Sequence, residues 1–181
     1  MAVSNWKIDP SHSAIHFSVR HMVVSKTRGR FTKWTGDIRF DPENPAASSV
    51  EVSIDPASID TADAQRDAHL RSPDFFDVEK FPTAAFRSTK IERAGGQYRV
   101  HGDLTVHGVT RPVVLDATFE GAGKDPWGGE RAGFSASVTI DRKDYGLEWN
   151  KALETGGLLV GEKVSLDLEV EAVKQAAQQA A

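Results

Sequence analysis

The sequence contains no cysteine. Disulfide bonds, thiolate nucleophiles and cysteine-ligated metal sites are therefore excluded. It also lacks an apolar run long enough to cross a bilayer as a helix, which predicts no stable membrane insertion. The first ten residues, MAVSNWKIDP, have no apolar core of the kind that a signal peptide needs. We therefore expect the chain to stay in the cytoplasm.

An excess of positive charge is missing too. The 181-residue chain has a formal net charge of -4 and a pI of about 5.9, which favours neither nucleic acid nor an anionic membrane as a partner. Hydrophobic residues make up 39% and charged residues 27%, which is ordinary for a folded protein and too apolar for a disordered one. The length suits one domain with a sizeable core.

Several signatures of catalysis and of nucleotide binding are absent. The motifs G-x-S-x-G, H-E-x-x-H and G-x-x-x-x-G-K do not occur. His12 and His16 share a strand face, but four residues of strand separate their alpha carbons by about 13 Å. That distance is too large for both imidazoles to bind one zinc ion. The sequence therefore predicts no cofactor and no metal site.

Apolar and other residues alternate over most of the chain, as in β-strands whose two faces differ. Turn signals rich in glycine, proline and aspartate separate the alternating segments. About eight strands follow from this spacing, so we predict an all-β sandwich or barrel. A barrel of this size can hold one small ligand. The alternating segments are 5–8, 12–21, 34–40, 50–54, 84–89, 98–106, 114–119, 134–140 and 164–170.

The stretch 61–88 interrupts the alternation. A short helix is predicted over residues 61–71, with Thr61 as its N-cap, and a second start signal follows at Ser72-Pro73. The helical excursion therefore spans about residues 61–77. Asp67 and Arg71 are four residues apart, and we expect them to pair on the helix surface.

Such a short helix needs contacts with the rest of the protein to persist. Phe75, Phe76 and Phe81 are the expected anchors that dock it onto the sheet. The excursion is then either a tightly packed connection or the lid of a ligand cavity.

Motifs in order along the chain resemble the YceI-like family. The central motif, T-A-D-A-Q-R-D-A-H-L-R-S-P-D-F-F-D-V-E-K-F-P, is the most distinctive. The others are W-K-I-D-P-S-H-S, F-S-V-R-H-M, G-D-L-T-V-H-G-V-T, G-F-S-A-S-V-T-I-D-R-K-D-Y-G and V-G-E-K-V-S-L-D-L-E-V-E-A. They occupy residues 6–13, 17–22, 61–82, 102–110, 133–146 and 160–172.

This resemblance implies a single lipocalin-like antiparallel β-barrel around an elongated apolar pore. It implies a domain over residues 1–173, followed by a frayed tail over 174–181. Family members are taken to bind polyisoprenoids or similar amphiphiles, with no established catalysis. Many of them are exported, whereas we expect this chain to stay in the cytoplasm. The resemblance also makes a homodimer plausible.

Together these observations predict an apolar pore that takes up a long lipid, with a polar mouth for its head group. The predicted wall consists of Phe17, Val19, Phe31, Trp34, Phe75, Phe76, Phe81, Phe86 and Phe134. The predicted mouth consists of Arg66, His69 and Arg71, with Arg28 and Arg30 from the basic run that starts at Lys26. The usual alternative for such a basic run is a solvated surface.

The predicted function is binding, carriage or sequestration of a long-chain isoprenoid-like amphiphile of the polyprenyl or quinone type, without catalysis. One alternative is an enzyme of lipid or quinone metabolism that uses the same pocket, with Asp67 or His69 as acid or base. Another is a stress-related interaction module that has no ligand and whose interior is filled by its own side chains.

Overall fold

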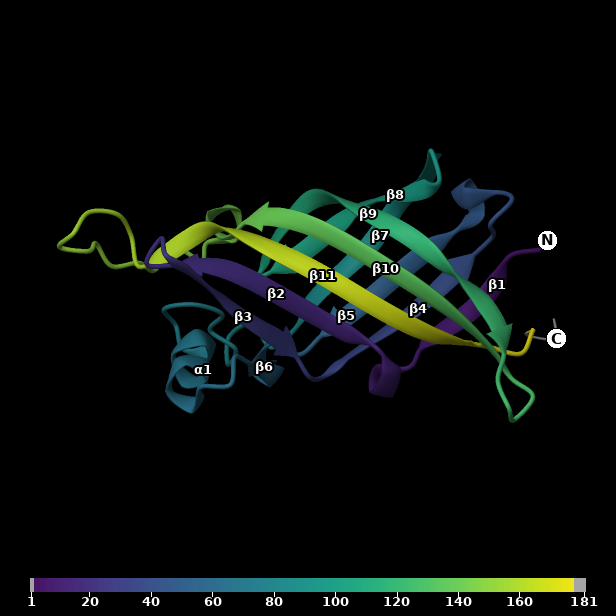
Figure 1. Cartoon of the computed structure of the whole chain (residues 1–181), viewed down its shortest axis with the longest axis horizontal. Coiled ribbons are helices and arrows are strands. Elements are labelled where there is room, and N and C mark those ends of the chain that lie inside the picture. Colours follow the sequence, from purple (N-terminus) through teal and green to yellow (C-terminus); the bar gives the residue numbers. More distant parts are fainter. Residues whose placement is uncertain (1, 178–181) are drawn as a thin grey trace.

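The computed structural model describes residues 2–177, and strands make up most of this chain (Figure 1). The strands are β1 (Ser4–Ile8), β2 (Ala14–His21), β3 (Ser25–Phe31), β4 (Trp34–Phe40), β5 (Ser49–Ile54), β6 (Ile59–Asp60), β7 (Ala84–Ala94), β8 (Gln97–Val106), β9 (Val109–Lys124), β10 (Glu130–Asp141) and β11 (Val160–Lys174). The helices are α1 (Ala64–Arg71) and the 3-10 turns η1 (Pro10–His12), η2 (Pro45–Ala47), η3 (Pro56–Ser58) and η4 (Arg142–Tyr145). No helix within residues 2–177 has the length and apolar content that crossing a bilayer requires.

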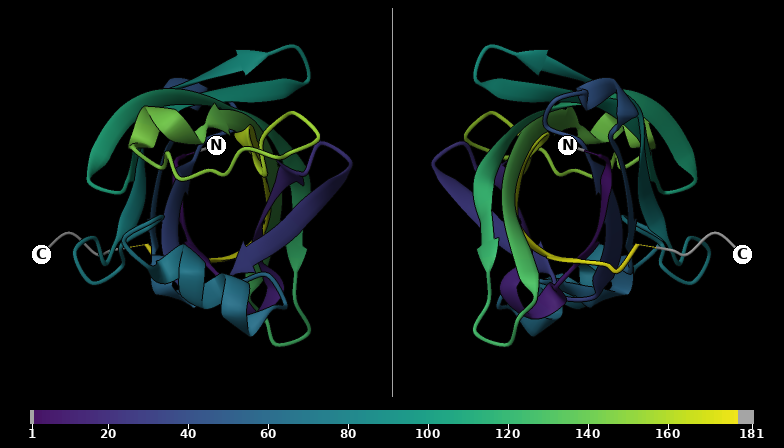
Figure 2. Two further views of the ribbon diagram at one scale, coloured as in Figure 1. Left: turned by 90° about the vertical axis from the view of Figure 1, so that its left-hand side faces the viewer. Right: turned by 90° about the vertical axis from the view of Figure 1, so that its right-hand side faces the viewer.

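Eight antiparallel strands close into a barrel, as the resemblance implied. Around the ring, β1, β4, β5, β7, β8, β9, β10 and β11 pair in that order. β1 closes the ring because it pairs with β4 on one side and with β11 on the other. Trp6, for example, lies opposite both Ile38 and Lys174. The ring is visible in the end-on views of Figure 2.

β2, β3 and β6 extend the wall beyond this ring. β11 is 15 residues long, so its last residues pair with β1 while its first part pairs with β2. η1 makes the step from β1 to β2, and Asp9 caps it by accepting a hydrogen bond from the amide of Ser11. The extension lies beside α1 at one end of the barrel, which we call the α1 end; both chain termini lie at the other, the terminal end (Figure 1).

Two tight turns fix the hairpins of the middle strands. Gly95-Gly96 joins β7 to β8, and Gly95 has a φ of 63°. His107-Gly108 joins β8 to β9 with φ values of 54° and 71°, the left-handed geometry of a two-residue hairpin turn. β9 therefore starts at Val109, earlier than the predicted segment 114–119, and it runs on to Lys124.

The helical excursion is shorter than predicted. α1 begins at Ala64, and its N-cap is Asp63, whose side chain accepts a hydrogen bond from the amide of Arg66. The predicted cap, Thr61, instead donates its hydroxyl to Asp67. After α1 the chain forms turns, because Ser72 ends the helix and its carbonyl accepts the amide of Phe75.

The terminal end has its own compact core. Trp6, Phe40, Ala132 and Ala172 are buried there, from β1, β4, β10 and β11. Of the tail predicted over 174–181, Lys174 belongs to β11, and the amide of Gln175 donates to the carbonyl of Asn5. Residues 178–181 lie outside the described residues.

Candidate functional site

The barrel encloses a cavity of about 270 Å³. Each of the eight ring strands contributes side chains to it, because every second residue of a strand points inward. On β11 these residues are Val164, Leu166, Leu168 and Val170. An apolar cavity of about 150 Å³ already suffices for a molecule such as benzene. The barrel interior is therefore large enough for an apolar chain.

A cluster of aromatic rings lies at the terminal end of this cavity. Phe40 packs edge-on against Phe134, with ring centroids 5.2 Å apart, and its centroid lies 4.9 Å from that of Phe119. Tyr98 packs edge-on against Phe40 at 5.8 Å. All four residues line the cavity and are backed by the buried core of the terminal end. They form the floor of the cavity.

The α1 end of the cavity is covered by the turn after α1. Phe76 inserts beside Phe31 of β3, with ring centroids 5.9 Å apart and the rings nearly perpendicular. Phe31 in turn lies 5.6 Å from Phe17 of β2. Leu70 and Phe75 also line the cavity. Of the two readings of the excursion, these contacts favour the lid.

The segment after η4 covers the cavity from the opposite side. In the left view of Figure 2, α1 lies below the ring while η4 and the segment after it lie above. Trp149 connects the two sides: its ring centroid lies 4.7 Å from that of His69 and 5.4 Å from that of Phe75. We call His69, Phe75 and Trp149 the aromatic bridge.

Two buried polar residues stand in this otherwise apolar end. Arg142 and Tyr145 both belong to η4, are 4% and 1% exposed, and line the cavity. Reasoning from the sequence assigned neither of them a role. The available signal was the D-R-K-D-Y-G motif, which places charged residues directly after an alternating strand. The remaining lining residues with a charged or hydroxyl-bearing side chain are Arg39, Ser48, Ser49, Tyr98, Thr118 and Ser135.

Eight of the nine predicted wall residues line the cavity: Phe17, Val19, Phe31, Trp34, Phe75, Phe76, Phe86 and Phe134. Phe81 does not. Its ring packs on His107, with centroids 4.6 Å apart, and lies against Gly108, where an added Cβ would come within 2.6 Å of the ring. Phe81 therefore anchors the end of the excursion on the β8–β9 turn. Contact of the other eight with a ligand stays a prediction.

The three predicted mouth residues of α1 lie outside the cavity lining. Arg66 turns back to the start of the helix and donates to the hydroxyl and carbonyl of Thr61. Arg71 donates to the carbonyl of Ala57, so it does not pair with Asp67 as predicted. His69 lies 2.8 Å from a carboxylate oxygen of Asp74 and belongs to the aromatic bridge. The polar side chains of α1 thus bind to neighbouring parts of the chain and hold the helix in place.

The two predicted mouth residues of β3 lie outside the cavity lining as well. Arg30 pairs with Asp60 of β6, with nitrogen and oxygen 3.3 Å apart. Arg28, with Lys26, borders a polar groove on the outer wall of the barrel. Inward and outward positions alternate along β3, so Phe31 faces inward while Arg28 and Arg30 face outward.

Asp67 is buried, yet it does not line the cavity. One of its oxygens accepts hydrogen bonds from both the amide and the hydroxyl of Thr61, at 2.9 and 2.6 Å. The carboxylate therefore holds α1 against β6 and the turn after it.

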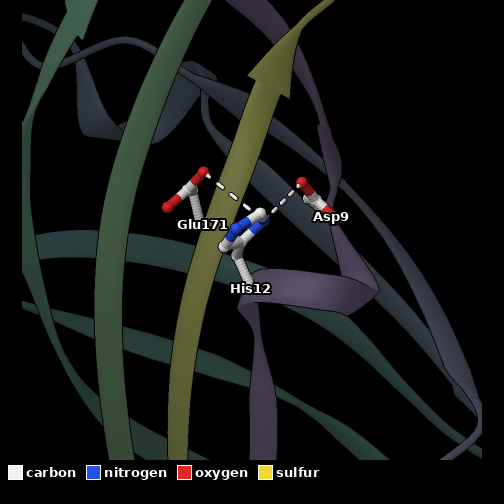
Figure 3. A group of neighbouring side chains, drawn as sticks. All are labelled: Asp9, His12 and Glu171. Carbon is white, nitrogen blue, oxygen red and sulfur yellow. Dashed lines mark hydrogen bonds and ion pairs between the residues drawn. The ribbon is translucent and has the colours of Figure 1, made fainter. Parts of the chain in front are cut away.

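One group of three possible metal ligands lies close together within residues 2–177: Asp9, His12 and Glu171 (Figure 3). The guanidinium of Arg131 also reaches this group. Its Nη1 lies 2.9 Å from Asp9 and 2.5 Å from Glu171. The guanidinium of Arg131 thus already bridges the two carboxylates, and the group is an ion-pair network between η1, β10 and β11.

Comparison with known proteins agrees with this architecture. The model of the YceI-like domain matches residues 6–172. A UPF0312 protein from Vibrio cholerae serotype O1 is 48% identical over 139 residues, which cover 76% of this chain and 74% of that protein.

Solved structures share the fold. The crystal structure of BcnA from Burkholderia cenocepacia superposes with a TM-score of 0.80 at 26% identity, over 91% of this chain and 98% of BcnA. A polyisoprenoid binding domain from Saccharophagus degradans superposes with a TM-score of 0.68 over 96% of this chain and 100% of that domain. At 16% identity, this second likeness shows the fold alone.

Proposed function

Because this chain belongs to the YceI-like domain family, we propose that it binds, carries or sequesters a long-chain isoprenoid-like amphiphile inside its barrel. The observation that carries the proposal is the cavity of about 270 Å³, lined by apolar side chains from every ring strand. Removing an apolar chain from water gains about 0.8 kcal/mol per CH₂ group. The related fold of a polyisoprenoid binding domain supports a ligand of this class.

Binding without catalysis fits the cavity better than the enzyme alternative. Asp67 and His69, the predicted acid or base, both lie outside the cavity lining. The carboxylate of Asp67 accepts a hydrogen bond from the amide of Thr61. The imidazole of His69 contacts Asp74 and packs against the rings of Phe75 and Trp149. The interaction-module alternative predicted an interior filled by the protein's own side chains, whereas the barrel leaves a cavity.

Replacement of Phe76 by Asp tests the proposal. The new carboxylate would lie in the apolar cavity at the α1 end, where burying a charge is unfavourable. We expect Phe76→Asp to abolish uptake of geranylgeraniol, measured through the fluorescence of the tryptophans, of which Trp34 lines the cavity. The urea denaturation curve should still show one cooperative transition.

Trp127→Asp is the control, because it also replaces an aromatic ring by a carboxylate but at an 84% exposed position outside the cavity lining. It should retain uptake of geranylgeraniol. Equal uptake by the wild type and Phe76→Asp would contradict the proposed site.

A further inference from the structure

The hydroxyl of Tyr145 is buried without a hydrogen-bond partner among the described residues. The side chain is 1% exposed and lines the cavity. Buried hydroxyl groups in proteins are nearly always hydrogen-bonded, so an orphan of this kind calls for a partner from outside the chain. Burial raises the pKa of Tyr145 above its usual value. The phenol therefore keeps its proton and remains a hydrogen-bond donor.

The backbone holds Tyr145 firmly in this position. Asp141 caps η4 by accepting the amide of Lys143, and Gly146 ends it in the left-handed conformation, with a φ of 74°. The carbonyl of Tyr145 lies 3.1 Å from Nδ1 of His107 in the β8–β9 turn. The orphan hydroxyl thus belongs to a fixed element, and no small rearrangement of a loose loop would satisfy it.

Arg142 adds a buried positive charge to the same element. Its guanidinium donates to the carbonyls of Leu147, Trp149, Val160 and Gly161 at 2.6 to 3.4 Å. A guanidinium has five N–H donors, so these four bonds leave one N–H without a partner among residues 2–177. Arginine stays charged even when burial lowers its pKa, as it does here.

No carboxylate within residues 2–177 pairs directly with Arg142. The two carboxylates whose charges act on Arg142 each pair with a lysine: Asp141 with Lys163, and Glu162 with Lys143. Asp141 and Glu162 thus act on the buried guanidinium only across space, and an anion placed beside it would add the direct counter-charge that favours a buried cation. This end of the cavity therefore offers a phenol O–H donor, which Tyr145 supplies, and a positively charged guanidinium, which has donors only.

We propose that Arg142 and Tyr145 bind the polar end of the amphiphile, and that this end carries a negatively charged acceptor oxygen, as in a carboxylate or a phosphate. The inference rests on the proposed function and adds an orientation to it. The head group lies at the α1 end, between η4 and the aromatic bridge. The apolar tail extends along the cavity to the rings of Phe40, Phe119 and Phe134.

Probes that share the same alkyl chain and differ only in their head group test the proposal. We would measure binding of hexadecanoate, hexadecyl phosphate and hexadecylammonium to the wild type by calorimetry. An anionic head group should bind more tightly than the ammonium, and the order of the two anions separates the carboxylate from the phosphate.

Tyr145→Phe should weaken binding of the preferred anion by roughly ten-fold or more, the range expected for a hydrogen bond to a charged group. Its affinity for hexadecylammonium should stay the same. Without ligand, the variant should be at least as stable as the wild type, because it removes an unsatisfied hydroxyl. If the hydroxyl had only a structural role, Tyr145→Phe would instead lower the free energy of unfolding measured by urea denaturation.

Tyr98→Phe is the matched control, because Tyr98 also lines the cavity but lies at its floor. It should leave the preference for anions intact. Equal affinity of the wild type for all three probes, or an unchanged preference in Tyr145→Phe, would overturn the head-group site alone. Failure of the wild type to bind any probe would overturn the proposed function and this inference with it.

Discussion

The carboxylate of Asp9 connects η1 with β10. It accepts hydrogen bonds from the amide and hydroxyl of Ser11, lies 3.0 Å from Nδ1 of His12 and pairs with Arg131. These partners, the Ser11 hydroxyl first, hold the pKa of Asp9 well below its usual value of 3.8. The same network raises the pKa of Arg131. The charged form of Asp9 is therefore the form that stabilises the fold.

The lowered pKa of Asp9 predicts how the stability of the protein depends on pH. Because the unfolded chain binds the proton more readily, the stabilisation is complete above about pH 4 and is lost as the pH falls toward the folded pKa. We expect Asp9→Asn to lower the free energy of unfolding by about 1 kcal/mol near pH 7. The difference from the wild type should shrink at about pH 3, as measured by urea denaturation.

Asp103→Asn, at an exposed position of β8, is the control and should change stability little at either pH. A loss of stability in Asp9→Asn that stayed constant between the two pH values would show that the charge of Asp9 is not what matters.

Alternation in the sequence predicts which residues share a strand face, and Phe17, Val19 and Phe86 from the predicted alternating segments all line the cavity. It could not place Phe81, since the position of a ring after a helix depends on the path of the turn. The hydrogen bond between Thr61 and Asp67 could not be predicted from the sequence for the same reason. Arg142 resembles a surface charge in the sequence, and only the carbonyls of the segment after η4 and of β11 make its burial tolerable.

At the scale of elements, α1 and the segment after η4 close the α1 end from two sides. α1 is only eight residues long and contributes few apolar side chains, so it depends on the aromatic rings that follow it. The sequence predicted the helix and its aromatic anchors, with bounds that were too wide. It did not predict the contact with Trp149, which lies far away along the chain.

The aromatic bridge gives a prediction about ligand exchange. Trp149→Ala removes the ring that packs on His69 and Phe75 but keeps the carbonyl that accepts from Arg142. Each aromatic pair contributes about 0.5–1.5 kcal/mol. We expect bound geranylgeraniol to dissociate about ten-fold faster, with stopped-flow fluorescence as the measurement.

Trp127→Ala is the control for this experiment, because Trp127 is 84% exposed in the loop between β9 and β10 at the terminal end. It should leave the dissociation rate unchanged. If Trp149→Ala released the ligand at the wild-type rate, the aromatic bridge would not be the barrier to exchange.

For the molecule as a whole, the alternation of apolar residues did not distinguish a β-sandwich from a β-barrel. The family resemblance predicted the barrel. Closure depends on β1, a strand of five residues that pairs with β4 and β11 at once. No local pattern shows such a double pairing. Closure leaves the ring strands without free edges and turns their apolar faces into one continuous cavity.

The proposed function depends on what occupies this cavity. The most direct measurement is mass spectrometry of the protein purified without detergent, first in the native state and then after extraction with organic solvent. We predict a stoichiometric long-chain isoprenoid or quinone that disappears from the native spectrum on extraction. A protein that is purified empty and also refuses added long-chain lipids would contradict the central claim.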